Sequence, residues 1–138
     1  MTDEESIRRM LDDLFQSFQT LDPCSMVPYY HLPSLAISGE RVSVMSTPAE
    51  VEARFARVME RLKTQDYARS SYSDARVMPL GDRLALLRVS GARYRRDGKL
   101  IEPLNITYVL RKTDAGWKVV VLASHDPGAG VAPSALVE

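Results

Sequence analysis

The sequence has 138 residues, of which 45% are hydrophobic and 26% are charged, a composition typical of one globular domain. Its 18 basic residues are balanced by 18 acidic ones, so the chain lacks the basic excess that supplies non-specific affinity for nucleic acids. The single cysteine excludes an intrachain disulfide, and no apolar run approaches the roughly 18 residues of a membrane-spanning helix. We therefore expect a cytoplasmic protein that binds neither nucleic acid nor membrane.

Two amphipathic helices are predicted in the first half of the chain. Thr2 and Glu5 have the spacing of a capping box, and apolar residues then recur at helical intervals. The second helix begins at residues 47–50, where threonine, proline and glutamate occupy positions typical of a helix start. The apolar faces consist of Ile7, Leu11, Leu14, Phe15, Phe18 and Leu21 in the first helix, and of Val51, Phe55, Val58, Met59 and Leu62 in the second.

The segment between these helices is rich in proline, which disfavours a long helix. Residues 22–33 predict a short turn of helix followed by a bend. Residues 34–38 and 41–46 then predict a short β-hairpin, because Gly39 permits a tight turn between them.

The second half of the chain is predicted to form four long antiparallel strands. They span residues 66–80, 83–96, 99–112 and 117–126, with turn signals between them. Strands of this length must twist and bend, and Gly91 and Pro103 mark the expected bends or bulges. The order of elements favours an α+β fold in which a curved antiparallel sheet wraps around the N-terminal helices. We expect a single domain over residues 1–127 and a flexible tail over residues 128–138.

Several short motifs, taken in this order, resemble the nuclear transport factor 2-like superfamily. The short helical turn ends in Tyr29-Tyr30-His31, the second helix begins at Thr47-Pro48, and the last strand runs from Gly116-Trp117-Lys118 to Ala123-Ser124-His125. The resemblance covers about residues 3–127 and extends to SnoaL-like polyketide cyclases and ketosteroid isomerases. It implies a cone-shaped α+β barrel, open at one end, that dimerises through the outer face of its sheet. It also implies no cofactor, because a buried acid or base beside an oxyanion donor is sufficient for the proton transfers of such enzymes.

The end of the last strand carries two candidate catalytic residues, His125 and Asp126. Neighbouring residues of a strand point to opposite faces, so the two side chains are not expected to form a contacting pair. Counting by twos puts Trp117 and His125 on one face, which slightly favours an inward His125 acting as a general base. An inward Asp126 would instead have a raised pKa and carry a proton. The alternative for either residue is a polar group at the strand end that binds backbone or water.

Further candidates lie on neighbouring elements. Tyr29 and Tyr30 precede His31 at the expected mouth of the pocket, where phenols can donate to an oxyanion and His31 is a tentative catalytic base. Roles in packing and turns are the alternative for these three residues. The remaining candidate ligand-binding residues are Arg88, Tyr94, Asn105, Tyr108 and Trp117.

The arginines of the second long strand give two contrasting expectations. Arg88 shares a face with Leu84 and Leu86, where a charge needs a ligand anion or an ion-pair partner. Asp126 or Glu102 would supply that partner. The basic residues around the following turn are expected to form a solvated hairpin tip; these are Arg93, Arg95, Arg96 and Lys99.

Two functions remain open from the sequence. The first is a SnoaL-like domain that binds a small apolar or aromatic molecule and, if catalytic, is a cofactor-independent lyase, isomerase or cyclase. The second is a non-catalytic homodimer that associates through its sheet, because both faces of the last strand are largely apolar. No close spacing of histidine and carboxylate residues indicates a metal site, and none is expected. The inner face of the first helix is apolar, whereas ketosteroid isomerases carry a tyrosine oxyanion donor there.

Overall fold

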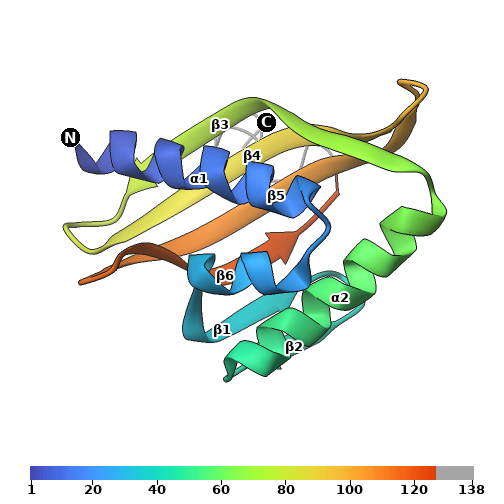
Figure 1. The fold of residues 1–138 in the computed structure, drawn as a ribbon. Helices are drawn as coiled ribbons and strands as arrows, with labels where there is room; N and C mark the ends of the chain where they lie inside the picture. Colours follow the sequence, from blue (N-terminus) through green and yellow to red (C-terminus); the bar gives the residue numbers. More distant parts are fainter. Residues whose placement is uncertain (127–138) are drawn as a thin grey trace.

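Helices cover one face of a six-stranded sheet in the computed structural model, which describes residues 1–126 (Figure 1). The helices are α1 (Asp3–Gln19), the 3₁₀ helix η1 (Pro23–Tyr29) and α2 (Pro48–Thr64). The strands are β1 (Tyr30–Ile37), β2 (Val42–Met45), β3 (Tyr67–Pro79), β4 (Leu84–Arg95), β5 (Leu100–Thr113) and β6 (Gly116–Ser124). The tail expected at residues 128–138 lies outside the described residues. Within residues 1–126, no helix has the length and apolar character needed to cross a membrane.

Both long helices begin at the predicted capping boxes. The backbone N–H of Glu5 donates to the Thr2 hydroxyl at 3.1 Å, and that of Glu50 donates to the Thr47 hydroxyl at 3.2 Å. Each such cap contributes about 1 kcal/mol to helix stability. The predicted apolar faces are buried through Ile7, Leu11, Leu14, Phe15 and Phe18 of α1 and through Val51, Phe55, Met59 and Leu62 of α2.

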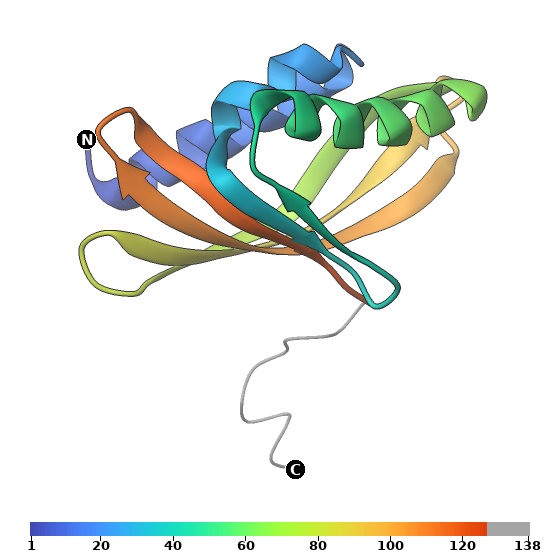
Figure 2. The same ribbon diagram turned by 90° about the horizontal axis from the view of Figure 1, so that it is seen from below.

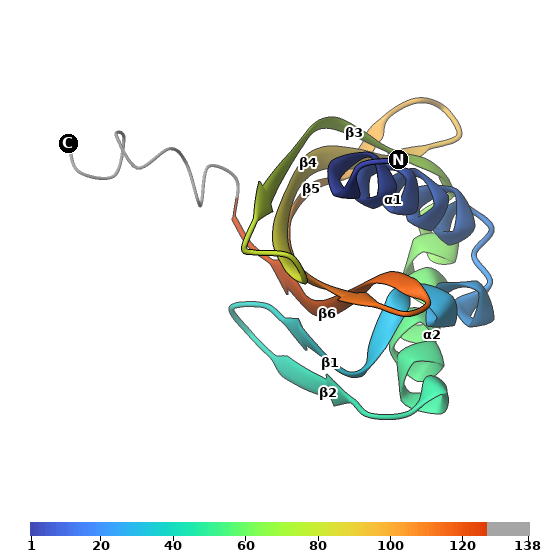
Figure 3. The ribbon, with the colours of Figure 1, turned by 90° about the vertical axis from the view of Figure 1, so that its left-hand side faces the viewer.

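The sheet has the strand order β2-β1-β6-β5-β4-β3, and its edge strands β2 and β3 do not pair with each other. Neighbouring strands are antiparallel except for β1 and β6, which run parallel. The sheet curves strongly, and α1 and α2 lie on its concave side (Figures 2 and 3). The predicted α+β architecture is therefore confirmed, although the parallel pair makes the sheet mixed rather than wholly antiparallel.

Strand β1 begins earlier than the hairpin predicted from the sequence. The chain becomes extended at Tyr30, directly after η1, and Tyr30 pairs with Val119 of β6. Residues 30–33, expected to form a bend, are therefore the first part of a strand. The predicted hairpin itself is confirmed, since Ser34 pairs with Met45 and Ile37 with Val42.

The predicted bend at Gly91 coincides with a β-bulge. The bulge lies in β3 between Tyr72 and Asp74, directly opposite Gly91 on β4. A Cβ atom at position 91 would lie 2.1 Å from the carbonyl oxygen of Ser71 and 2.8 Å from Cα of Tyr72. Glycine is thus required here because the two backbones approach too closely for any side chain.

Pro103, the second predicted bend, occupies a regular position paired with Ala92 of β4. Pairing of β5 with β6 starts only at Ile106, so the edge of β5 that Pro103 occupies has no strand beyond it. A proline is tolerated there because its missing N–H is not needed for the ladder.

Gly91→Ala is expected to lower the free energy of unfolding by about 1–3 kcal/mol, because the added methyl group overlaps the backbone of β3. Chemical denaturation followed by far-ultraviolet circular dichroism measures the change. Gly39→Ala is the control, since nothing lies within 4 Å of its Cβ position, and it should change stability by less than about 0.5 kcal/mol. Equal losses in both variants would contradict the role of the close approach.

Candidate functional site

A cavity of about 310 Å³ lies between the helices and the concave face of the sheet. Half of the lining residues are apolar: α1 and α2 contribute Phe15, Phe18 and Phe55, and β5 contributes Leu104 and Ile106. The same side chains belong to the hydrophobic core. The cavity therefore adjoins the hydrophobic core on the concave side of the sheet, where Figure 3 shows the helices.

Charged and phenolic side chains reach this cavity from four elements. They are Tyr30 from β1, Arg54 and Arg61 from α2, Arg93 from β4, and Glu102 and Tyr108 from β5. Among the described residues of the lining, three guanidinium groups are thus present with a single carboxylate.

Glu102 is held between two of these arginines. Arg61 donates to both carboxylate oxygens at 2.8 and 3.1 Å, and Arg93 donates to Oε2 at 2.5 Å. Burial raises the pKa of Glu102, but the hydrogen bonds and charges of Arg61 and Arg93 outweigh burial and hold that pKa below its ordinary value. Glu102 is therefore ionised at neutral pH and is poorly suited to carry a proton.

The prediction that Arg93 belongs to a solvated hairpin tip is wrong. Only 14% of its side chain is exposed, and its guanidinium carbon lies 4.7 Å from the centroid of the Phe18 ring. The buried Leu87 and Val89 mark the inner face of β4, and counting by twos from them leads to Arg93. That count is the signal in the sequence that identifies the residue. The other predicted tip residues, Arg95, Arg96 and Lys99, are exposed.

Tyr30 and Tyr108 place two phenol groups on the cavity wall. Both residues are buried, and burial raises the pKa of each phenol well above its ordinary value, although the charges of Arg54 and Arg93 oppose this. Both groups are therefore protonated at neutral pH and can donate hydrogen bonds. They supply the hydroxyl groups that the inner face of α1 lacks.

A second β-bulge changes which side chains of β6 face the helices. The pairing with β5 shifts between Val119 and Val121, so one residue is inserted there and the alternation moves by one. Leu122, rather than Val121, is consequently buried on the inner side. The count by twos from Trp117 to His125 fails for this reason.

His125 lies at the edge of the cavity, with its imidazole directed toward the outer face of the sheet. Its Nε2 is 2.9 Å from the hydroxyl of Thr107, a residue that alternates with the buried Ile106 and Tyr108. Asp126 is exposed and does not line the cavity. His125 thus sits at the rim, with Asp126 next to it in the chain but outside the lining, and their catalytic roles stay predictions.

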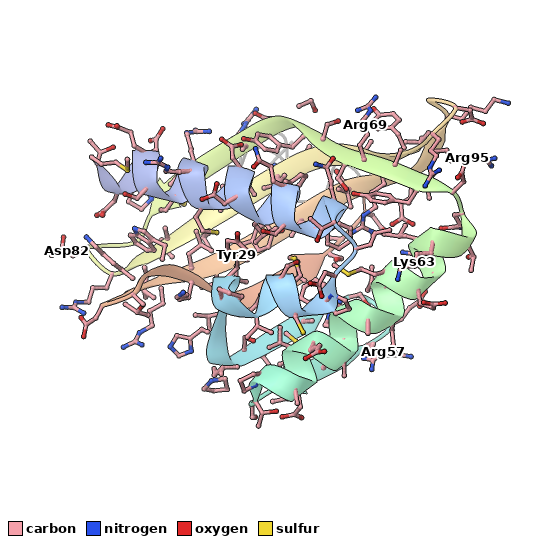
Figure 4. All side chains as sticks on the ribbon, in the orientation of Figure 1. Tyr29, Arg57, Lys63, Arg69, Asp82 and Arg95 are labelled. Carbon is pink, nitrogen blue, oxygen red and sulfur yellow. The ribbon has the colours of Figure 1, made fainter. Side chains whose placement is uncertain are left out.

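His31 and Tyr29 lie outside the cavity. The two ring nitrogens of His31 are each 3.0 Å from a partner, Nδ1 from the carbonyl oxygen of Pro33 and Nε2 from the guanidinium of Arg111. The Tyr29 hydroxyl is 2.8 Å from the hydroxyl of Ser17, a contact that joins η1 to α1 (Figure 4). Of the Tyr29-Tyr30-His31 motif, only Tyr30 reaches the cavity.

Arg88 lies on the outer face of β4, because its neighbours Leu87 and Val89 are fully buried on the inner face. The apolar face that Arg88 shares with Leu84 and Leu86 is therefore directed away from the helices. Glu102, one of its two expected partners, pairs instead with Arg61 and Arg93.

The three other predicted ligand-binding residues are separated in the structure. Asn105 contributes to the cavity lining, whereas Tyr94 stacks under the guanidinium of Arg69 at 4.2 Å and Trp117 is buried away from the cavity. Among residues 1–126, no group of three or more histidine, cysteine or acidic side chains is arranged to hold a metal ion.

Glu102→Gln is expected to lower the free energy of unfolding near neutral pH by about 1 kcal/mol, because Arg61 and Arg93 lose a charged acceptor in a partly exposed cluster. The folded-state pKa of Glu102 lies below its ordinary value of 4.5, so its contribution is complete above that value. The contribution is lost as the pH falls through the folded-state pKa. The stability difference between the two proteins should accordingly shrink in acid.

Asp74→Asn is the matched control for this measurement. Asp74 pairs with Arg76 at 3.1 Å on the surface, where both side chains are at least half exposed, and its removal should cost less than about 0.5 kcal/mol. Urea denaturation over a series of pH values measures both variants. A Glu102→Gln difference that stays constant into acid would rule out the depressed pKa as its source.

Three solved structures share this fold at low sequence identity. An NTF2-like protein with a cystatin-like fold from Novosphingobium aromaticivorans matches with a TM-score of 0.76 and 18% identity, over 99% of this chain and 89% of that one. A protein of unknown function with a cystatin-like fold from Nostoc punctiforme PCC 73102 gives 0.73 and 13%, over 94% and 95%. A ketosteroid isomerase-like protein from Erwinia carotovora atroseptica SCRI1043 gives 0.63 and 15%, over 90% and 95%. At these identities the likeness shows the fold alone.

No curated protein matches the chain. Residues 3–127, in contrast, match a family described as NTF2-like protein (DUF6841). The match runs from the first residue of α1 past the end of β6, so it includes every element that lines the cavity. The chain belongs to this NTF2-like family.

Proposed function

We propose that this protein binds a small molecule in the cavity between its helices and the concave face of its sheet. The supporting observation is the cavity of about 310 Å³, whose lining combines aromatic and aliphatic side chains with charged and phenolic groups. Small-molecule sites are mostly apolar and typically measure about 300–1,000 Å³. The ligand is therefore compact, and its main part is apolar or aromatic. The cytoplasmic location expected from the sequence is part of this proposal.

The catalytic form of this proposal is a cofactor-independent lyase, isomerase or cyclase. Tyr30 and Tyr108 would donate hydrogen bonds to an oxyanion that forms on the ligand, since both phenols stay protonated. Glu102 is engaged by two arginines, so the proton carrier would be His125 or Asp126 at the rim.

Val58→Trp is expected to abolish binding of a neutral aromatic probe, indole, because Val58 lines the cavity and the larger side chain occupies it. Two-dimensional amide NMR during an indole titration measures this binding, and the shifted signals should belong to inner residues of β4 and β5. Ala53→Trp places the same side chain on an exposed position of α2 and should leave binding unchanged. Indole shifts that persist in a folded Val58→Trp variant would show that the probe binds elsewhere.

A second candidate function, homodimerisation through the sheet, is favoured by the outer face. Directly paired residues form one apolar row across all six strands, and no helix of residues 1–126 covers that face (Figure 2). The row consists of Val44, Leu35, Val121, Val109, Leu86 and Met78. An exposed apolar row of this kind is typical of an association surface.

Val109→Asp is expected to convert a dimer into a monomer, because it puts a charge near the centre of the apolar row. Sedimentation equilibrium at micromolar concentration measures the assembly state. Leu100→Asp is the control, since Leu100 is 56% exposed at the start of β5 and lies outside the row. A monomeric unmodified protein at that concentration would overturn this candidate.

A further inference from the structure

The charges around the cavity do not balance. Arg54, Arg61 and Arg93 contribute three positive charges to the lining, and Glu102 contributes the single negative charge among the described residues. Two positive charges therefore remain in excess. Phenylalanine walls surround them, and in such apolar surroundings a charge is costly unless it has a counter-charge.

Arg93 has a donor that Glu102 does not satisfy. One terminal nitrogen of its guanidinium donates to Glu102, but the Nε–H is buried and has no hydrogen-bond partner within residues 1–126. A buried N–H of a charged group is rarely left unsatisfied, because its loss of solvation is not compensated. The Phe18 ring, whose centroid lies 4.7 Å from the guanidinium carbon, stabilises the positive charge but supplies no counter-charge.

Arg54 differs from Arg61 and Arg93 because it has no carboxylate partner among the described residues. No ion pair within residues 1–126 involves it, and the like charges of Arg57 and Arg93 disfavour its charged form. Burial, opposed only in part by Tyr30 and Tyr108, lowers its pKa. Burial and like charges therefore make an anionic partner favourable beside Arg54.

Arg54 and Arg93 act on the same part of the cavity. Arg54, Arg93, Tyr30 and Tyr108 all line this one cavity. The positive charges of both arginines also act on both phenols and partly oppose the rise in the pKa of each. All four groups are hydrogen-bond donors. Such a space is complementary to a negatively charged acceptor.

We propose that the molecule bound in this cavity is a compact organic acid whose carboxylate lies between Arg54 and Arg93 and whose apolar part packs against Phe15, Phe18 and Phe55. The inference rests on the proposed function and adds the chemical class of the ligand. A carboxylate fits because its two oxygens match the planar fork of a guanidinium. A phosphate carries more charge and is more strongly hydrated, which suits these apolar walls less well.

Isothermal titration calorimetry with benzoate and phenylacetate, each compared with its uncharged amide, tests this inference. Each acid should bind at least about tenfold more tightly than its amide, a difference that one charge-assisted hydrogen bond supplies. Arg93→Gln and Arg54→Gln should each remove most of that preference while changing amide affinity little. Arg93→Lys should retain part of the preference for acids, because lysine keeps the positive charge but lacks the planar guanidinium that binds both carboxylate oxygens.

Arg95→Gln is the matched control, two residues along the same strand from Arg93. Arg95 lies outside the cavity lining, near an end of the sheet (Figure 4), and its side chain is 47% exposed beside Asp97. This variant should keep the full preference for acids. Circular dichroism and the urea midpoint establish that each variant is folded, so a loss of preference reports on the cavity.

The outcomes separate this inference from the proposed function. If the amides bind as tightly as the acids and Val58→Trp weakens both, the inference of a carboxylate ligand is wrong. The proposal that the cavity binds a small molecule would still hold. Inorganic phosphate that binds in an Arg93-dependent manner where the acids do not would also overturn it. Failure of indole, acids and amides alike would overturn both proposals.

Discussion

The ion-paired cluster of Arg61, Glu102 and Arg93 is the contact on which the geometry of the site depends. It joins α2 to β4 and β5 through groups 41 residues apart in the chain, at the place where the helix and the sheet enclose the cavity. Partly exposed pairs of this kind contribute little net stability, so the main consequence of the cluster is positional. It holds the guanidinium of Arg93 against Phe18 and engages both oxygens of the only carboxylate in the described lining.

Two bulges decide which side chains share the cavity with this cluster. The bulge in β3 opposite Gly91 lets β3 and β4 approach within backbone contact and bend together. The bulge in β6 moves the alternation of that strand by one residue, so Leu122 faces the helices and the imidazole of His125 reaches Thr107 instead. One bulge thus bends the sheet beside the cavity, and the other decides which side chains of β6 line it.

Those irregularities also explain what the sequence can and cannot predict. The capping boxes at Thr2 and Thr47 act over three residues, so the helices were predictable from short patterns. The bulge in β6 has no comparable signal, because Val119, Val120 and Val121 give no indication of which residue is inserted. A partner such as Glu102 for Arg61 depends on how distant elements pack, which composition and spacing do not determine. Counting alternate residues along β4 places Arg93 on the inner face. Its position next to a turn nevertheless favours the prediction that it belongs to a solvated hairpin tip.

Strand alternation gives the two proposed functions separate sets of side chains within one chain. In β5, Tyr108 lies on the cavity side, whereas its neighbour Val109 belongs to the apolar row on the outer face. The side chains proposed for ligand binding and for association are therefore different, and neither function requires the residues of the other.

Association on the outer face would nevertheless affect binding on the inner face, because it would change the dielectric environment of the sheet. A second copy on the outer face would exclude water from the far side of β4 and β5, the strands that carry Arg93 and Tyr108. Electrostatic interactions strengthen as water is excluded, so an anion between Arg54 and Arg93 would then be bound more tightly. Association through the sheet and binding of an acid within the cavity are thus physically compatible, and the first would favour the second.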